Sequence, residues 1–367
     1  MRKLSTLLIG LTLAVGGLRA DDKPGRAEQL KAIRADLAKA QEGFRKEMKA
    51  GTIKPDAEGE YPGWTDLLKR FVEPTRALIA ADPADAVALD AILFAVRDLD
   101  AADPDLFGLA LKHHVASEKI DPLLRLRSAP VEFLREVAVK SPHPRLRIWS
   151  EYHLAEALYA VGKREAAEPL LESLCRNAEA KALGGYATGT LADTAGRLLF
   201  EMRKLNVGQE APELAGEDLD DKPLKLTDYR GKVTLFVFWA TWCGPCMDMV
   251  AHERKLVEHY AARPFAIVGA NGDTLPHKRY TSKGEDGKVI DNTVAVKAAV
   301  EKNKITWRSF RNVTMFESPL LDWNVRSWPT IYLLDERGVI RGKWKGDPGA
   351  KELDAAVEKL VKAAEAK

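Results

Sequence analysis

Cysteine is scarce in this chain of 367 residues, which contains three. That number is too small for a multi-bridge disulfide framework or a four-cysteine zinc site, so hydrophobic cores are expected to stabilise the fold. Charge of one sign is lacking too, because 56 Lys and Arg nearly balance 54 Asp and Glu, for a formal net charge of +2. This balance gives no global electrostatic reason to expect nucleic acid as a partner.

The apolar stretch at residues 4–18 is shorter than the ~20 residues that a membrane-spanning helix needs. It follows the basic residues Arg2 and Lys3 and ends near the small residue Ala20. This pattern is typical of an export signal at residues 1–20, which we expect to be cleaved after Ala20 rather than retained as an anchor. The mature chain is then expected in the periplasm or cell envelope, where disulfides persist.

The chain length predicts two folded domains, and the mix of 46% hydrophobic and 30% charged residues is typical of globular proteins. Residues 21–206 combine helix-forming residues at helical spacing with frequent prolines, which predicts an all-α domain of short helices. Residues 149–180 resemble one tetratricopeptide helix–turn–helix with Gly162 in the turn, although no recurrence at the ~34-residue period follows. Helical hairpins stack into peptide-binding surfaces, so we expect this domain to be a docking module.

Residues 207–367 have a different pattern, in which apolar, β-branched and aromatic runs alternate with helical segments. This alternation predicts an α/β domain with a mixed sheet covered by helices on both faces. A cluster of aspartates at 218–221 predicts a hairpin turn, and 271–291 is interpreted as a surface insertion. The expected strands are 233–240, 264–270, 329–334 and 339–345, and the expected helices are 245–262, 292–303 and 350–364.

The clearest chemical motif is Trp242-Cys243-Gly244-Pro245-Cys246, directly after the first expected strand and at the start of a helix. The positive end of a helix favours a thiolate, so Cys243 is the expected nucleophile and Cys246, one turn further, the resolving thiol. An inert disulfide is one alternative, but so short a loop makes a weak staple. Zinc is the other, but no second pair of ligands accompanies the two cysteines. Thiol redox chemistry without a cofactor is the favoured interpretation.

Four separated motifs then occur in a recognisable order. They are Val207 to Glu213, Leu226 to Lys232, Phe238 to Cys246, and Trp328-Pro329-Thr330. Over residues 207–367 they resemble the envelope thioredoxin-like oxidoreductases, the TlpA-like and ResA-like proteins of the redoxin group. The resemblance implies a thioredoxin fold and disulfide exchange with protein substrates. Gly-Pro between the cysteines resembles reducing members, which implies a reductant supplied with electrons by a membrane partner.

The same resemblance suggests further site residues. Pro329 matches the cis-proline that faces the cysteine pair. Trp328 before it departs from the family, in which a non-aromatic residue usually precedes this proline, and we expect its indole to cover the Cys243 sulfur and favour apolar substrate side chains. Trp242, Gly244 and Pro245 are expected to support the site. A redox-inert interaction scaffold and a thiol peroxidase of the redoxin group remain alternative functions.

Two departures concern the carboxylate that relatives place near the cysteines. Val237 stands where thioredoxin has a buried aspartate, and Met249 where ResA-like relatives often have a glutamate. Asp248 is an uncertain substitute, because adjacent residues of a helix point about 100° apart. The third cysteine, Cys175, lies on an apolar helical stripe and is interpreted as a small buried side chain rather than a reactive thiol.

Overall fold

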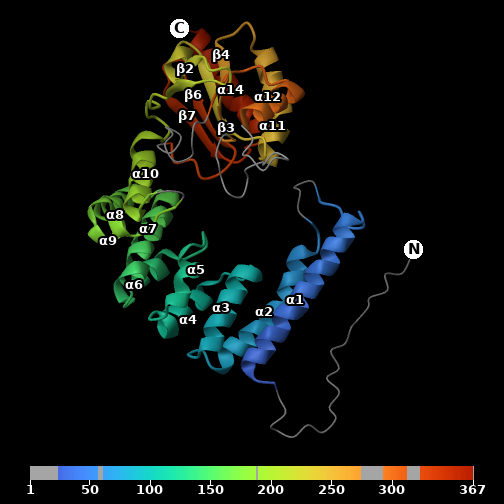
Figure 1. Ribbon diagram of the computed structural model, residues 1–367, viewed down its shortest axis with the longest axis vertical. Coiled ribbons are helices and arrows are strands. Elements are labelled where there is room, and N and C mark those ends of the chain that lie inside the picture. Colours follow the sequence, from blue (N-terminus) through green and yellow to red (C-terminus); the bar gives the residue numbers. More distant parts are fainter. Residues whose placement is uncertain (1–23, 57–60, 187–188, 274–291, 312–322, 367) are drawn as a thin grey trace, which may run out of the picture. The chain divides into compact units, whose positions relative to one another are not determined.

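The computed structural model describes residues 24–56, 61–186, 189–273, 292–311 and 323–366 (Figure 1). The chain divides into two compact units, residues 1–150 and 151–367. The expected export signal and most of the expected insertion at 271–291 lie outside the described residues. The second unit therefore contains, besides the sheet, helices that the sequence groups with the amino-terminal domain.

The described elements of the first unit are helical, as the sequence predicts. They are α1 (Arg26–Lys49), α2 (Trp64–Ala81), α3 (Ala86–Asp98), α4 (Pro104–His114), the 3-10 helix η2 (Glu118–Ile120), α5 (Asp121–Leu124), α6 (Val131–Lys140) and the beginning of α7 (Pro144–Ala160). Aspartate caps begin two of them, because Asp85 and Asp103 accept hydrogen bonds from the first backbone N–H groups of α3 and α4. Phe107 and Phe133 pack edge to face in the core, with ring centres 5.1 Å apart.

The second unit opens with the remainder of α7, followed by α8 (Arg164–Arg176), α9 (Ala178–Ala182) and α10 (Leu191–Lys204). The predicted helix–turn–helix is confirmed by α7 and α8, with Gly162 at a φ of 77° in the turn between them. Helix α10 begins with a capping box between Thr190 and Asp193, and its buried face includes Leu191, Ala195, Leu198 and Met202.

A mixed sheet follows in this unit, as the sequence predicts, with five strands rather than the four expected. Its order is β5 (Ser309–Phe310), β4 (Phe265–Asn271), β3 (Val233–Trp239), β6 (Thr330–Leu334) and β7 (Ile340–Lys345). Strand β3 is central, parallel to β4 and antiparallel to β6. Since β3 is buried at every position, its sequence is a continuous apolar run rather than an alternating one.

The remaining described elements flank this sheet. They are the hairpin β1 (Ala215–Glu217) and β2 (Pro223–Lys225), the 3-10 helix η3 (Leu226–Tyr229), and helices α11 (Gly244–His259), α12 (Asn292–Asn303) and α14 (Ala350–Glu365). The hairpin confirms the turn predicted from the aspartates at 218–221, because β1 and β2 pair antiparallel across it.

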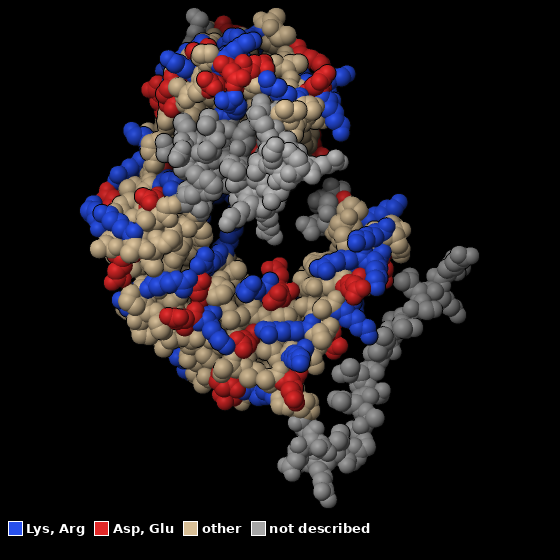
Figure 2. Space-filling model, viewed as in Figure 1, with Lys and Arg blue, Asp and Glu red and all other residues tan. Residues whose placement is uncertain are grey.

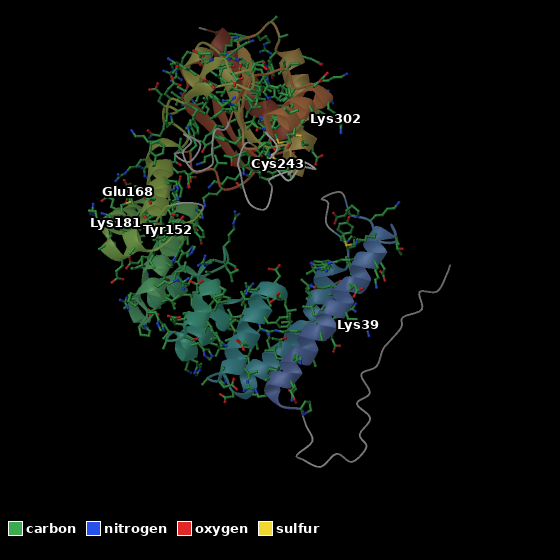
Figure 3. The ribbon with its side chains drawn as sticks, in the orientation of Figure 1. Lys39, Tyr152, Glu168, Lys181, Cys243 and Lys302 are labelled. Atoms are coloured by element: carbon green, nitrogen blue, oxygen red, sulfur yellow. A yellow bond between two sulfur atoms is a disulfide. The ribbon has the colours of Figure 1, made fainter. Side chains whose placement is uncertain are left out.

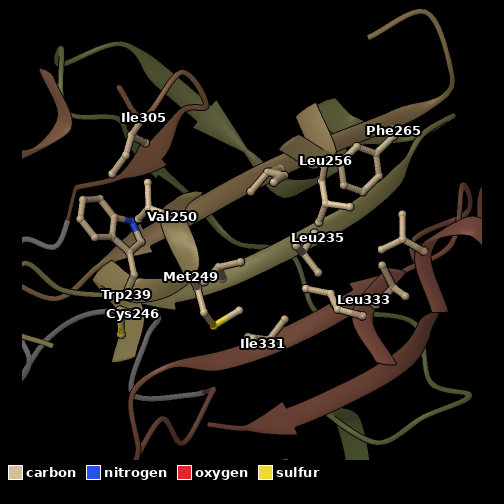
Figure 4. Close-up of a cluster of buried hydrophobic side chains, with 14 of the residues drawn as sticks. Leu235, Trp239, Cys246, Met249, Val250, Leu256, Phe265, Ile305, Ile331 and Leu333 are labelled. Carbon is tan, nitrogen blue, oxygen red and sulfur yellow. The ribbon is translucent and has the colours of Figure 1, made fainter. Parts of the chain in front are cut away.

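Two hydrophobic cores lie on the two faces of the sheet, because successive side chains of β3 point to opposite sides. We call the first the α11 core: Leu235, Val237 and Trp239 pack there with side chains of α11 and α14 (Figure 4). We call the second the α10 core: Phe236 and Phe238 pack there with Trp323, Tyr332 and Leu205, which directly follows α10. Phe200 of α10 packs against this second core.

The surface shows no dominant sign of charge in the visible view. Acidic and basic side chains are interspersed there over both units (Figure 2), in keeping with the formal net charge of +2. None of the helices within the described parts of the chain combines the length and the hydropathy that crossing a bilayer requires.

Candidate active site

A disulfide joins Cys243 and Cys246 at the start of α11 (Figure 3). Cys243 is the N-cap residue, and its Sγ accepts a hydrogen bond from the backbone N–H of Cys246, with N and Sγ 3.2 Å apart. Gly244 and Pro245 form the first turn, where proline costs no helical hydrogen bond. Once the disulfide is reduced, this N–H and the helix dipole favour a thiolate on Cys243. Trp242, just outside the helix, is exposed.

Strand register brings two other loops to the cysteine pair. Phe238 pairs with Thr330 across β3 and β6, so Pro329 lies beside the end of β3 from which the cysteine loop leaves. Trp239 pairs with Asn271 across β3 and β4, so Gly272 and Asp273 lie on the other side of the same end. The site therefore lies where three loops meet at the end of the central strands β4, β3 and β6.

The predicted cis peptide bond between Trp328 and Pro329 is confirmed. The carbonyl oxygen of Pro329 accepts a hydrogen bond from the backbone N–H of Gly346, with N and O 2.8 Å apart. The half-buried Trp328 ring packs edge to face against that of Trp242, with centres 5.7 Å apart. It also packs against the α11 core, to which Cys243 belongs. Cover of the Cys243 sulfur by this indole stays a prediction.

Asp273 ties the loop before Cys243 to the end of β4. Its carboxylate accepts hydrogen bonds from the backbone N–H of Thr241, 2.7 Å away, and from the Thr241 hydroxyl. The Asn271 side chain donates to the same carboxylate at 2.7 Å, and the backbone N–H of Asp273 donates back to Asn271 at 3.0 Å. Sequence reasoning missed this network, for which the polar run Asn271-Gly272-Asp273 directly after a buried strand was the available signal.

Comparison with known proteins agrees with this geometry. The model of the AhpC/TSA family matches residues 207–343. The thioredoxin-like protein YneN of Bacillus subtilis is 31% identical over 159 residues, which cover 41% of this chain and 78% of that protein. The chain belongs to the ResA-like family of thioredoxin-like thiol–disulfide oxidoreductases.

Two further proteins are similar to this chain. The thiol-disulfide oxidoreductase ResA of Bacillus thuringiensis is 24% identical over 158 residues, covering 43% of this chain and 80% of that protein. The solved thioredoxin domain of a thiol-disulfide oxidoreductase from Bacteroides vulgatus is 25% identical, with a TM-score of 0.33, and covers 43% of this chain and 99% of that one. The family match, at residues 207–343, lies in the second unit, and the helices of the first unit lie outside it.

The structure places the residues at the two positions where relatives have a carboxylate, and the acidic residues near them. Val237 and Met249 are buried in the α11 core, where Met249 extends from α11 toward Ile331 of β6 (Figure 4). Asp248 is exposed, whereas Cys246 is buried, so Asp248 does not share the buried environment of the resolving cysteine. The buried carboxyl group of α11 is instead Glu253, whose residue is 3% exposed.

Glu253 lies seven residues after Cys246, on the same buried face of α11. Burial, together with the negative charge of Asp347, raises the pKa of Glu253 to about 8. The group is therefore largely protonated at neutral pH. Sequence reasoning did not single out Glu253; its spacing from Cys246, two helical turns, was the signal that could have found it.

Cys175 provides the contrast to the cysteine pair. It is a free thiol, partly buried on α8, with its Sγ 3.8 Å from the carbonyl oxygen of Ala192 on α10. Burial raises the pKa of the Cys175 thiol, which favours its protonated form. Cys243, in contrast, lies at a helix N-terminus, which favours a thiolate. The sequence predicts a small buried side chain, and the structure shows one that is partly buried.

Proposed function

We propose that this chain is a cell-envelope oxidoreductase that reduces protein disulfides through Cys243 and Cys246. The observation that carries the proposal is the place of Cys243. It caps α11, its sulfur receives a backbone N–H, and its disulfide partner lies one turn further along the helix. This arrangement lowers the free energy of a Cys243 thiolate, which is the attacking species in disulfide exchange.

The reaction proceeds in two exchanges. In the first, the Cys243 thiolate attacks one sulfur of a substrate disulfide, forms a mixed disulfide and releases the other substrate sulfur as a thiolate, which takes up a proton. In the second, Cys246 loses its proton and attacks Cys243, which frees the remaining substrate sulfur as a thiol after protonation. The substrate gains two electrons and two protons, and the protein ends with the Cys243–Cys246 disulfide.

Turnover as a reductant needs a dithiol donor that reduces this disulfide again. We assign that role to a membrane partner, which fits the expected export signal and the Gly-Pro pair between the cysteines. A measured reduction potential tests the direction: a value near about −270 mV supports a reductant, and one near about −120 mV an oxidant.

Serine variants test the chemistry, and the chain supplies its own matched control. Cys243→Ser should reduce the rate of insulin disulfide reduction to the uncatalysed level, because the nucleophile is gone. Cys246→Ser should accumulate mixed disulfides, because the resolving thiol is gone. Cys175→Ser should keep full activity. Full activity in both of the first two variants would refute the proposal. A wild type that does not reduce insulin would favour the inert scaffold, and consumption of hydrogen peroxide in place of insulin reduction would favour the thiol peroxidase.

The helical region at residues 21–206 is proposed to be a docking module for a protein partner. The support is that its described elements, α1 to α10, are helical, as in proteins whose helical hairpins stack into peptide-binding surfaces. Exchange with small disulfides should therefore not depend on them, whereas exchange with the physiological partner should.

A further inference from the structure

Gly272 and the indole of Trp328 lie in direct contact. A β-carbon placed on residue 272 would lie 2.4 Å from Cη2 of Trp328, 2.8 Å from Cζ2 and 3.2 Å from Cζ3. The φ angle of Gly272 is not in the left-handed region, so its backbone conformation does not call for glycine. What the position requires is the absence of a side chain, since any β-carbon would occupy the space of the six-membered ring of the indole.

The backbone at residue 272 is held in place from both sides. Its N–H donates to the carbonyl oxygen of Trp239 at the end of β3, with N and O 2.9 Å apart. Its neighbours Asn271 and Asp273 are buried and belong to the network that fixes Thr241. A side chain added at residue 272 would therefore displace the indole rather than the backbone.

The displaced indole would leave its place against Trp242. That contact, edge to face with centres 5.7 Å apart, puts an aromatic pair on the loops that flank the disulfide. Trp242 is 48% exposed, so the pair presents apolar surface to whatever approaches Cys243.

We propose that Gly272 is a specificity-determining residue of this oxidoreductase: it positions the Trp328 indole against Trp242, and the pair selects protein disulfides flanked by apolar side chains. This inference rests on the proposed exchange at Cys243. A protein segment reaching the disulfide lays its flanking side chains against the two rings. A small hydrophilic disulfide reaches the Cys243 sulfur without contacting the two rings, so the rings do not strengthen its binding.

The test uses the full chain, the variant Gly272→Ala, and two substrates: insulin as the protein disulfide and oxidised glutathione as the small one. We expect kcat/KM for insulin to fall about three- to tenfold, mainly through KM, which corresponds to the loss of one aromatic contact. The value for glutathione and the reduction potential of the cysteine pair should change little. Trp328→Ala, which leaves Gly272 intact, should shift the insulin-to-glutathione ratio in the same direction.

Gly342 provides the matched control. A β-carbon there would lie 2.3 Å from Cη2 of Trp344, whose indole N–H donates to Glu352 of α14. Gly342→Ala should therefore lower stability by the same kind of clash and leave the ratio unchanged. In a Trp328→Ala background, Gly272→Ala should have no further effect on the ratio.

Each unfavourable outcome has a distinct meaning. An unchanged ratio in Gly272→Ala and Trp328→Ala, or an equal fall in Gly342→Ala, would overturn the inference while the wild-type activity upholds the proposed function. A wild-type protein that reduced neither substrate would refute the proposed function, and this inference with it.

Discussion

Two glutamates are buried on opposite faces of one sheet, and they differ in charge. Glu201 of α10 is 1% exposed and Glu253 of α11 is 3% exposed. Burial by itself raises the pKa of Glu201, but Lys343 and Lys345 outweigh it, so the pKa lies below the ordinary value. Glu253 has the negative charge of Asp347 nearby instead, and its pKa is raised to about 8. Nearly equal burial thus gives opposite protonation states.

The two glutamates differ in charge because their charged neighbours differ, since the extent of their burial is nearly the same. On the α10 side, Glu201 accepts hydrogen bonds from the Lys343 ammonium at 2.6 Å and from the Asn324 side chain. It thereby links α10 to β7 and to the segment that leads into Trp328 and Pro329. On the α11 side, Glu253 is a protonated group two helical turns along α11 from Cys246.

The largest effect is expected from Glu201→Ala. Lys343, whose side chain is 13% exposed, would lose the carboxylate that favours its charged form, while burial, which already lowers its pKa, would remain. Breaking a buried ion pair by removing one side typically costs about 3–5 kcal/mol. Urea unfolding at neutral pH measures this loss. A loss below about 1 kcal/mol would mean that the α10 side does not depend on an ionised Glu201.

Glu253→Gln should remove a pH dependence of stability. The folded protein holds this proton more tightly than the unfolded chain, because the pKa is about 8 when folded against 4.5 ordinarily. The stabilisation is therefore complete below about pH 4.5 and is lost as the pH rises through about 8, by at most about 5 kcal/mol, since one pKa unit corresponds to about 1.4 kcal/mol.

The variant should match the wild type near pH 5 and exceed it near pH 8.5. Thermal unfolding at both values measures the difference. Parallel pH profiles for the two proteins would show that Glu253 is ionised in the folded state.

Lys345→Ala should have the smallest effect. Its ammonium lies 3.2 Å from Glu201, but the side chain is 51% exposed, and solvent screens the pair. We expect a loss within about 1 kcal/mol in urea unfolding, well below the loss for Lys343→Ala. Equal losses for the two lysines would indicate that both ion pairs are shielded from water to the same degree.

Local pattern was sufficient to predict the regular elements with strong periodicity. Strand β3, expected at 233–240, occupies Val233–Trp239, and α12 occupies Asn292–Asn303 as expected. Long apolar runs and helical periodicity can be recognised in a single sequence. Strand β5, at Ser309–Phe310, was missed, since two residues are too few to show alternation. The sheet order was not predicted, because it depends on contacts between distant segments.

The same distinction separates the parts of the site. Cys243 and Cys246 were found because their motif is contiguous in the chain. Gly272 and Asp273 were missed because their importance arises from the pairing of β3 with β4, which places them beside Thr241 and Trp328. Glu253 was missed because a glutamate on a helix is ordinarily exposed, and only the packing of α11 shows that this one is not.

The shared core on the α10 side limits where such a chain can be recombined during evolution. Leu205 lies inside that core and Phe200 packs against it, and both precede the first residue of the family match, at 207. A redoxin domain that began at residue 207 would lack Glu201, and the sheet face of the α10 core would lose the side chains that α10 packs on it. A viable crossover therefore lies upstream of α10, so that this helix travels with the sheet that it covers.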